Sequence, residues 1–131
     1  MAKLLSTAMT TPVQVTADTA VPLGDVVRKA GCDIAARGTY IAERVQGYYL
    51  VFVNAIFAPT ASGTVTMQLM ENGTAIPGAA TTDVVGAANE SSEFTLAGIV
   101  SRVPCCVEKN ISVSFSAAGS LESISVTVVR V

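Results

Sequence analysis

The sequence predicts an all-β protein, with about eight or more strands arranged as an antiparallel sandwich or barrel. Val, Thr, Ser and Ala dominate its 131 residues, and long runs of strong helix formers are absent. Several segments alternate polar and apolar residues, which is the pattern of a half-buried strand. Turn residues recur at about the 8–12-residue spacing of such folds, and no linker divides the chain, so we expect one domain.

The clearest strands are those in which the alternation is regular. Residues 64–69 alternate and lead into Asn72-Gly73, a pair that favours a type I′ hairpin turn because both residues tolerate positive φ. Residues 74–76 return, and Pro77-Gly78 are expected to end that strand. Residues 24–31 allow a short helix of about two turns between two glycines. The expected strands are 11–15, 39–45, 47–58, 64–69, 74–76, 81–87, 93–103, 111–116 and 123–128.

The segment 47–58 departs from the alternation because it is apolar on both faces. Tyr49, Val51, Val53, Ala55 and Phe57 fall on one side, and Tyr48, Leu50, Phe52 and Ile56 fall on the other with the polar Asn54 among them. Two-sided burial is typical of parallel sheets covered by helices, which this sequence lacks. Either one face meets the core and the other meets another chain, or one face of a central strand lies under a long loop. Aromatic residues concentrate at interfaces, and five of the seven Tyr and Phe lie within residues 40–57, which favours the second chain.

Composition excludes several classes of protein. Half of the residues are apolar, only 14% are charged and the mean hydropathy is +0.54, the opposite of a disordered chain. Polar residues and glycines interrupt every apolar stretch, so no membrane helix is expected. The net charge of −2 and the pI of 4.9 argue against a nucleic-acid partner. Residues 1–8 contain no apolar run of signal-peptide length, so we expect folding in a cytoplasm.

The residue types that are missing exclude most catalytic sites. The chain has no His, so Ser-His-Asp and Cys-His pairings and His-ligated zinc sites cannot be built from it. Its carboxylates are dispersed, and no glycine-rich nucleotide loop is present. We therefore expect no catalytic residues, no metal and no cofactor. The protein is expected not to be an enzyme.

Three cysteines remain, Cys32 and the adjacent pair Cys105-Cys106. A vicinal disulfide, a three-thiolate metal site and a bridge between subunits are the functional interpretations. Zinc prefers four ligands and a bridge between adjacent residues is strained, which weakens them. Free thiols that pack as small apolar groups in a reducing compartment are the favoured interpretation.

Two segments resemble a known superfamily. Residues 47–51 and 66–79 are similar to the tumour-necrosis-factor and complement-globular-head proteins, above all to their bacterial and phage branch, which includes the C-terminal domains of collagen-like spore-surface glycoproteins. The G-x-Y-x-F strand of the family is matched with Val51 in place of Phe. Its L-x-x-N-G-x-x-[VI]-P-G hairpin is matched by Leu69, Asn72, Gly73, Ile76, Pro77 and Gly78. Residues 103–106 look like those of small stand-alone proteins of Firmicute bacteria and their prophages, and the resemblance covers residues 11–131.

The resemblance implies an antiparallel jelly-roll sandwich of about ten strands that assembles as a tight homotrimer. By the same resemblance, Tyr48, Leu50 and Phe52 face the threefold axis, and Asn54 and Ile56 continue that face as trimer-interface residues. Residues 1–10 are expected to form a flexible arm ahead of the domain at 11–131. The chain lacks the collagen-like stalk of the spore-surface proteins, which indicates a free-standing trimer.

The sequence favours a structural role over a catalytic one. The expected function is a bacteriophage virion component, such as a capsid decoration protein made in the host bacterial cytoplasm, with itself and a capsid shell protein as partners. No nucleic acid and no membrane are expected as partners. The alternative is a surface-exposed trimer that binds a ligand or receptor, such as a phage tip or a spore or cell-surface adhesin module.

Overall fold

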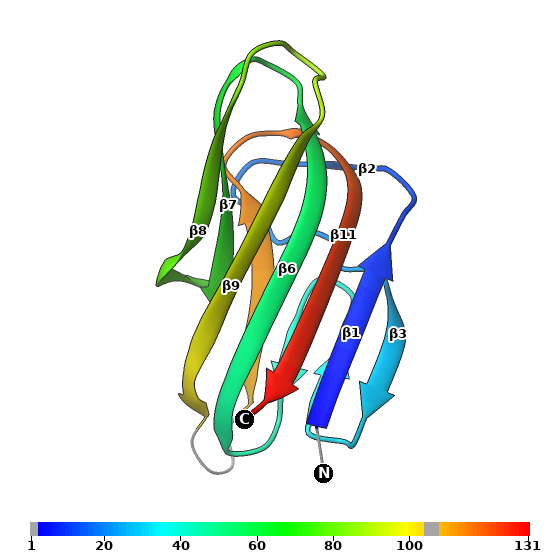
Figure 1. Ribbon diagram of the computed structural model, residues 1–131, viewed down its shortest axis with the longest axis vertical. Coiled ribbons are helices and arrows are strands. Elements are labelled where there is room, and N and C mark those ends of the chain that lie inside the picture. The colour runs from blue at the N-terminus through cyan, green and yellow to red at the C-terminus, as the bar shows by residue number, and fades with distance from the viewer. Residues whose placement is uncertain (1–2, 104–107) are drawn as a thin grey trace.

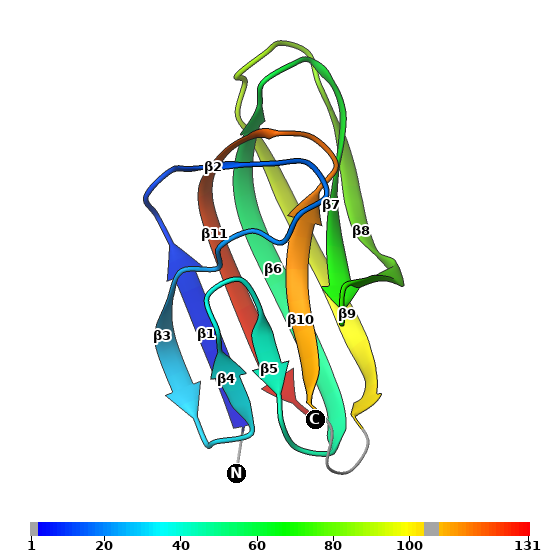
Figure 2. The same ribbon diagram turned by 180° about the vertical axis from the view of Figure 1, so that it is seen from behind.

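Two antiparallel sheets pack face to face (Figures 1 and 2). The computed structural model describes residues 3–103 and 108–131, and in these ranges it contains eleven strands. Sheet A has the order β3 (Asp25–Ala30), β1 (Lys3–Met9), β11 (Gly119–Arg130), β6 (Gly47–Pro59) and β9 (Ser92–Val103), with β2 (Val13–Val15) also paired to β11. Sheet B has the order β4 (Ile34–Ala36), β5 (Ile41–Glu43), β10 (Lys109–Phe115), β7 (Gly63–Glu71) and β8 (Thr74–Val85).

Most neighbours in the sheets are far apart in the sequence. The first and last strands lie side by side, with Lys3 opposite Arg130 and Met9 opposite Ile124. Strand β6 lies next to the β9 edge of sheet A, paired with β11 on one side and β9 on the other (Figure 1). The molecule is therefore an all-β antiparallel jelly-roll sandwich, which confirms the predicted fold class.

The core lies between the sheets and is filled by alternate residues of the strands. At its aromatic centre, Phe57 of β6 stacks on Phe115 of β10 with ring centroids 4.2 Å apart and an angle of 10° between the rings. Phe94 of β9 meets both rings edge-on, at 6.4 Å and 5.5 Å. All three side chains are buried, and pairs of this geometry add stabilisation to that of apolar burial itself.

Residues 3–9 belong to a sheet, in contrast to the flexible arm expected at residues 1–10. Lys3–Met9 form β1, which is hydrogen-bonded to β11 over its whole length and to β3 on its other side. The side chains of Leu5 and Thr7 are fully buried. The local sequence of this segment does not predict a strand, because the strand is stabilised by pairing with segments elsewhere in the chain. The helix considered for residues 24–31 is also absent, since residues 25–30 form the exposed edge strand β3.

The hairpin of β7 and β8 confirms one expectation and corrects another. Asn72 and Gly73 have φ of 51° and 80°, as a type I′ turn requires. Pro77-Gly78 do not end the strand, because β8 continues through them to Val85 with a register shift. The amide of Gln68 donates to the carbonyl oxygens of Ile76 and Ala79, at 3.1 Å each. These bonds satisfy the backbone on both sides of the irregularity.

The thiols divide into one that is described and two that are not. Cys32 is exposed and forms no disulfide. Cys105 and Cys106 lie outside the described residues, so their interpretation stays a prediction. Within residues 3–103 and 108–131, no helix has the length and apolar character needed to cross a membrane.

Candidate self-association face

Strand β6 presents two faces to different surroundings. Its inner residues, Tyr49, Val51, Val53, Ala55 and Phe57, are buried between the sheets, as predicted. Its outer residues leave much of their surface exposed in a single chain: 52% for Tyr48, 47% for Phe52 and 39% for Ile56. Leu50 is half-buried and Asn54 is exposed. All five residues predicted for the trimer interface thus lie on one face, which we call the outer face of sheet A.

The strands beside β6 extend this apolar surface. The backbone register places Ile99 of β9 and Val129 of β11 on either side of Leu50. Ile99 is 62% exposed, and Val129 is half-buried. The apolar pattern of residues 47–58 does not predict that these two residues belong to the face, because they lie on other strands. Their signal was present in the alternation of β9 and β11, but only the pairing shows that these residues join Leu50.

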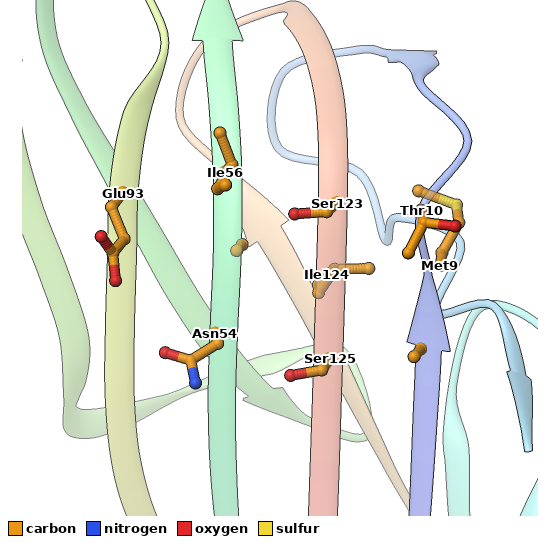
Figure 3. Close-up of a pocket in the computed structure, with 10 residues that line it drawn as sticks. Met9, Thr10, Asn54, Ile56, Glu93, Ser123, Ile124 and Ser125 are labelled. Carbon is orange, nitrogen blue, oxygen red and sulfur yellow. The ribbon is translucent and has the colours of Figure 1, made fainter. Parts of the chain in front are cut away.

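A shallow hollow lies on the upper half of the outer face, between β6, β11 and the end of β1 (Figure 3). Its volume is about 350 Å³, and its lining includes Met9, Asn54, Ile56, Glu93, Ser123 and Ser125. The serine hydroxyls point across the face toward β6 (Figure 3). The lining combines neutral polar groups with apolar ones, and Glu93 lies at its β9 side.

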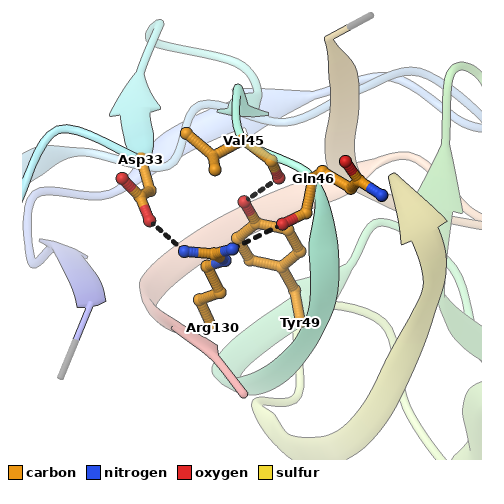
Figure 4. Close-up of polar contacts among 5 residues, drawn as sticks. All are labelled: Asp33, Val45, Gln46, Tyr49 and Arg130. Carbon is orange, nitrogen blue, oxygen red and sulfur yellow. Dashed lines mark hydrogen bonds and ion pairs between the residues drawn. The ribbon is translucent and has the colours of Figure 1, made fainter. Parts of the chain in front are cut away.

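A polar cluster fixes the lower end of β6, where the two faces begin (Figure 4). Arg130 donates from Nη1 to Oδ2 of Asp33 at 2.9 Å and from Nη2 to the carbonyl oxygen of Gln46 at 2.6 Å. The hydroxyl of the buried Tyr49 donates to the carbonyl oxygen of Val45 at 2.5 Å, and burial raises the pKa of that hydroxyl. These bonds tie the end of β11 to the turns that precede β4 and β6, so the direction in which Tyr48 leaves the sheet is fixed.

Glu43 of β5 is a buried carboxyl group. Its side chain is fully buried, and neither carboxylate oxygen has a hydrogen-bond partner. Desolvation and, to a smaller extent, the charge of Glu71 raise its pKa from 4.5 to about 8, against the opposing effect of Lys109. Lys109 Nζ donates to Oε1 of Glu71 at 2.6 Å. Glu43 therefore carries a proton at neutral pH, which removes most of the cost of burying it.

Within residues 3–103 and 108–131, no group of three or more His, Cys, Asp or Glu side chains is placed to hold a metal ion. Glu43 and Glu71 lie near each other, but Glu43 is sealed from solvent and Glu71 is paired with Lys109. The exposed apolar face is thus the feature with the clearest functional meaning.

Solved structures with the same arrangement of strands cover almost the whole chain. Murine APRIL superposes with a TM-score of 0.76 at 16% identity, over 100% of both chains. Eiger TNF from S. frugiperda gives 0.73 at 12% identity, over 99% of this chain and 92% of that one. The fold is the jelly roll of the tumour-necrosis-factor proteins. The globular domain of zebrafish complement 1qA shares it, with a TM-score of 0.66 at 13% identity over 97% and 94% of the two chains.

These similarities show that the chain has the jelly-roll fold of the proteins that residues 47–51 and 66–79 resemble in sequence. At identities of 12–16% they carry the fold and nothing beyond it. No protein-family model and no curated protein sequence matches the chain.

Proposed function

We propose that this protein is a non-enzymatic structural module that assembles as a homotrimer through the outer face of sheet A. The observation that carries the proposal is the exposure of Tyr48, Phe52 and Ile56 on β6, an interior strand of sheet A, with Ile99 on the neighbouring strand β9. An apolar face of this kind on a sparsely charged chain is typical of an interface. The fold likeness to tumour-necrosis-factor and complement proteins supports a threefold arrangement, as the sequence resemblance implies.

Charge supports a second copy as the occupant of this face. The outer residues of β6 are uncharged, and so are the β9 residues Thr95, Ala97 and Ile99 beside Asn54, Phe52 and Leu50, whereas Glu93 lies beside Ile56. From Tyr48 to Asn54 two copies can therefore meet without burying an unpaired charge, with Glu93 at the margin of the contact. Tyr48 and Phe52 would supply the large buried aromatic surface that stabilises such interfaces.

The first test of the trimer is Phe52→Glu. Three carboxylates would meet in an apolar interface, so we expect the variant to be monomeric or to aggregate, whereas the wild type runs as a trimer in light scattering. Ala80→Glu is the matched control, because Ala80 is exposed on β8 of sheet B. A Phe52→Glu variant that stays trimeric like the control would contradict the assignment of this face.

Within this role, a bacteriophage virion component is the finer proposal, with capsid decoration as its form. It is supported by the resemblance of residues 47–51 and 66–79 to the bacterial and phage branch, by the small size of the domain and by its low charge. Mass spectrometry of purified particles from a host that carries the gene tests it. We expect this chain in full particles at a multiple of three copies, and its absence from them would contradict the virion role.

A ligand-binding trimer is the second candidate. It is favoured by a hollow of about 360 Å³ beside Tyr48, lined further by Ile76, Pro77 and Ile99 where β8 and β9 meet. Pro77 of β8 lies outside the proposed trimer interface, and an exposed proline at the rim of a hollow suits the apolar face of a sugar or a peptide. Binding on a glycan array that is lost in Pro77→Glu, with the trimer intact, would favour this role over decoration.

A further inference from the structure

Three ionisable side chains of sheet B lie together at the end where β10 begins and β7 ends. The backbone register places Lys109 of β10 directly opposite Glu43 of β5. It places Glu71 of β7 opposite Ile111, two residues further along β10. Ile111 is a core residue, so strand alternation puts Lys109 and Glu71 on the inner face of the sheet as well. We call Lys109, Glu71 and Glu43 the Lys109 cluster.

The amine and one carboxylate of the cluster are close together and largely shielded from water. Nζ of Lys109 lies 2.6 Å from Oε1 of Glu71, and the two side chains are only 15% and 19% exposed. The neighbouring ion pair of Arg44 with Glu108 is longer, at 3.5 Å, and its side chains are about half exposed. A nitrogen hydrogen-bonded to a carboxylate oxygen lies about 3–3.5 Å from the carboxylate carbon, which is the separation of reacting atoms in a near-attack geometry.

Glu43 supplies a buried acid beside this pair. Its side chain is fully buried, and neither carboxyl oxygen has a hydrogen-bond partner among the residues that the structure describes. A buried polar group without a partner calls for a reason, and a role in proton transfer is one. Desolvation raises the pKa of Glu43 to about 8, so the group carries a proton at neutral pH that it can donate and recover.

We propose that Lys109 and Glu71 form an intramolecular amide bond, an isopeptide cross-link between β10 and β7, with Glu43 as the proton shuttle. The three groups come from three neighbouring strands of one sheet, in the order β5, β10 and β7. The cross-link therefore forms within one chain and does not depend on the proposed trimer.

The reaction is a condensation that releases water. A proton passes from Nζ of Lys109 to Oε1 of Glu71, which leaves a neutral amine beside a neutral carboxyl group. Nζ then attacks Cδ of Glu71 and forms the C–N bond, while Glu43 takes one proton from Nζ and gives its own to the departing Glu71 hydroxyl. The C–O bond breaks, one water molecule leaves, and Glu43 ends protonated as it began.

Two features of the site favour the amide over the ion pair. The sheet holds the amine against the carboxyl group, and well-oriented groups of this kind react as if present at about 10⁵–10⁸ M. Removing an ammonium and a carboxylate from water costs solvation free energy, whereas the amide that replaces them is neutral. The exposed pair of Arg44 with Glu108 has neither the enclosure nor a nucleophilic amine.

Mass spectrometry of the purified full chain, unfolded before measurement, tests the cross-link. Lys109→Arg is the matched variant, because a guanidinium keeps the charge and the pairing with Glu71 but is not a nucleophile at neutral pH. Glu43→Gln removes the shuttle and leaves the ion pair in place. Circular dichroism verifies that each variant is folded. Trypsin digestion locates the bond, since an acylated Lys109 is not cleaved and joins its peptide to the one that contains Glu71.

We expect the wild-type chain to be lighter than calculated for its sequence by the mass of one water molecule, with one branched peptide that joins Lys109 to Glu71. Folded Lys109→Arg and Glu43→Gln are expected at their full calculated masses. A wild-type chain at full mass after prolonged incubation at neutral pH overturns the proposal, as does a water loss that persists in Lys109→Arg. A cross-link that persists in folded Glu43→Gln overturns the role of Glu43 as the shuttle.

Discussion

The two faces of β6 carry similar side chains in different surroundings. Phe57 on the inner face stacks on Phe115 between the sheets, whereas Phe52, five residues earlier on the outer face, is 47% exposed in one chain. The inner face is completed by the chain's own second sheet. The outer face carries the surplus apolar surface of a half-apolar, sparsely charged sequence. The difference teaches that apolar composition reports burial but not which molecule provides it.

Polar groups on the two sides are accommodated differently. Inside, Glu43 loses water and has no hydrogen-bond partner, so the proton it keeps is its means of avoiding a buried charge. Outside, Asn54 and Thr95 are exposed to solvent in the single chain. The interior thus accepts a polar group by neutralising it, whereas the outer face leaves its polar groups in contact with water.

The largest expected effect is on the free energy of unfolding, which should depend on pH because of the buried Glu43. Because the pKa of Glu43 is raised to about 8 in the folded protein, the folded state holds a proton that the unfolded state releases above its ordinary value. The free energy of unfolding is therefore highest below about pH 4.5 and falls as the pH rises toward 8, by at most on the order of 5 kcal/mol from this group. Urea denaturation at pH 5, 6, 7 and 8 measures it.

Glu43→Gln is the control for this pH dependence. The amide has nearly the same shape and cannot ionise, so the variant should lose the decline between pH 5 and 8. The ion pair of Glu71 with Lys109 remains in place in the variant. An equal decline in wild type and variant would show that another group is responsible.

The next prediction compares the same substitution, Phe to Ala, on the two faces of β6. Phe57→Ala should lower the free energy of unfolding by about 3–5 kcal/mol, because it leaves a cavity against Phe115 and Phe94. Phe52→Ala should change the unfolding of the separated chain by less than about 1 kcal/mol, but should weaken the assembly. Denaturation at several protein concentrations separates the two effects. Equal losses from both, independent of concentration, would contradict the assignment of the faces.

The smallest effect lies at the lower end of β6, where the two faces begin. Asp33→Asn keeps a hydrogen-bond acceptor for Arg130 and removes the charge, so we expect a loss of about 1–2 kcal/mol that shrinks in high salt. Cys32→Ser, next to it in the chain and exposed, is the control and should be near neutral. Urea denaturation at low and high salt measures both. If Asp33→Asn lowers the free energy of unfolding no more than Cys32→Ser does, the ion pair of Asp33 with Arg130 does not stabilise this end of β6.

Local patterns in the sequence account for much of the fold. The alternation of 64–69 and the Asn72-Gly73 turn predict the β7–β8 hairpin, and the doubled apolar pattern of 47–58 predicts both faces of β6. Strand β1 escaped prediction because its stability comes from pairing with β11, more than a hundred residues away in the chain. The local sequence predicts a strand end at Pro77-Gly78, because the Gln68 side chain that supports this irregularity lies on the neighbouring strand.

Local sequence is enough to predict the all-β fold class and the two faces of β6, because strand alternation assigns each side chain to a face wherever the strand is placed. What lies beside each face depends on the packing of the whole chain. The register brings Ile99 and Val129 next to Leu50, aligns Thr95 and Ser125 with Asn54, and encloses Glu43 away from water. These arrangements depend on contacts between distant segments, which no local pattern specifies.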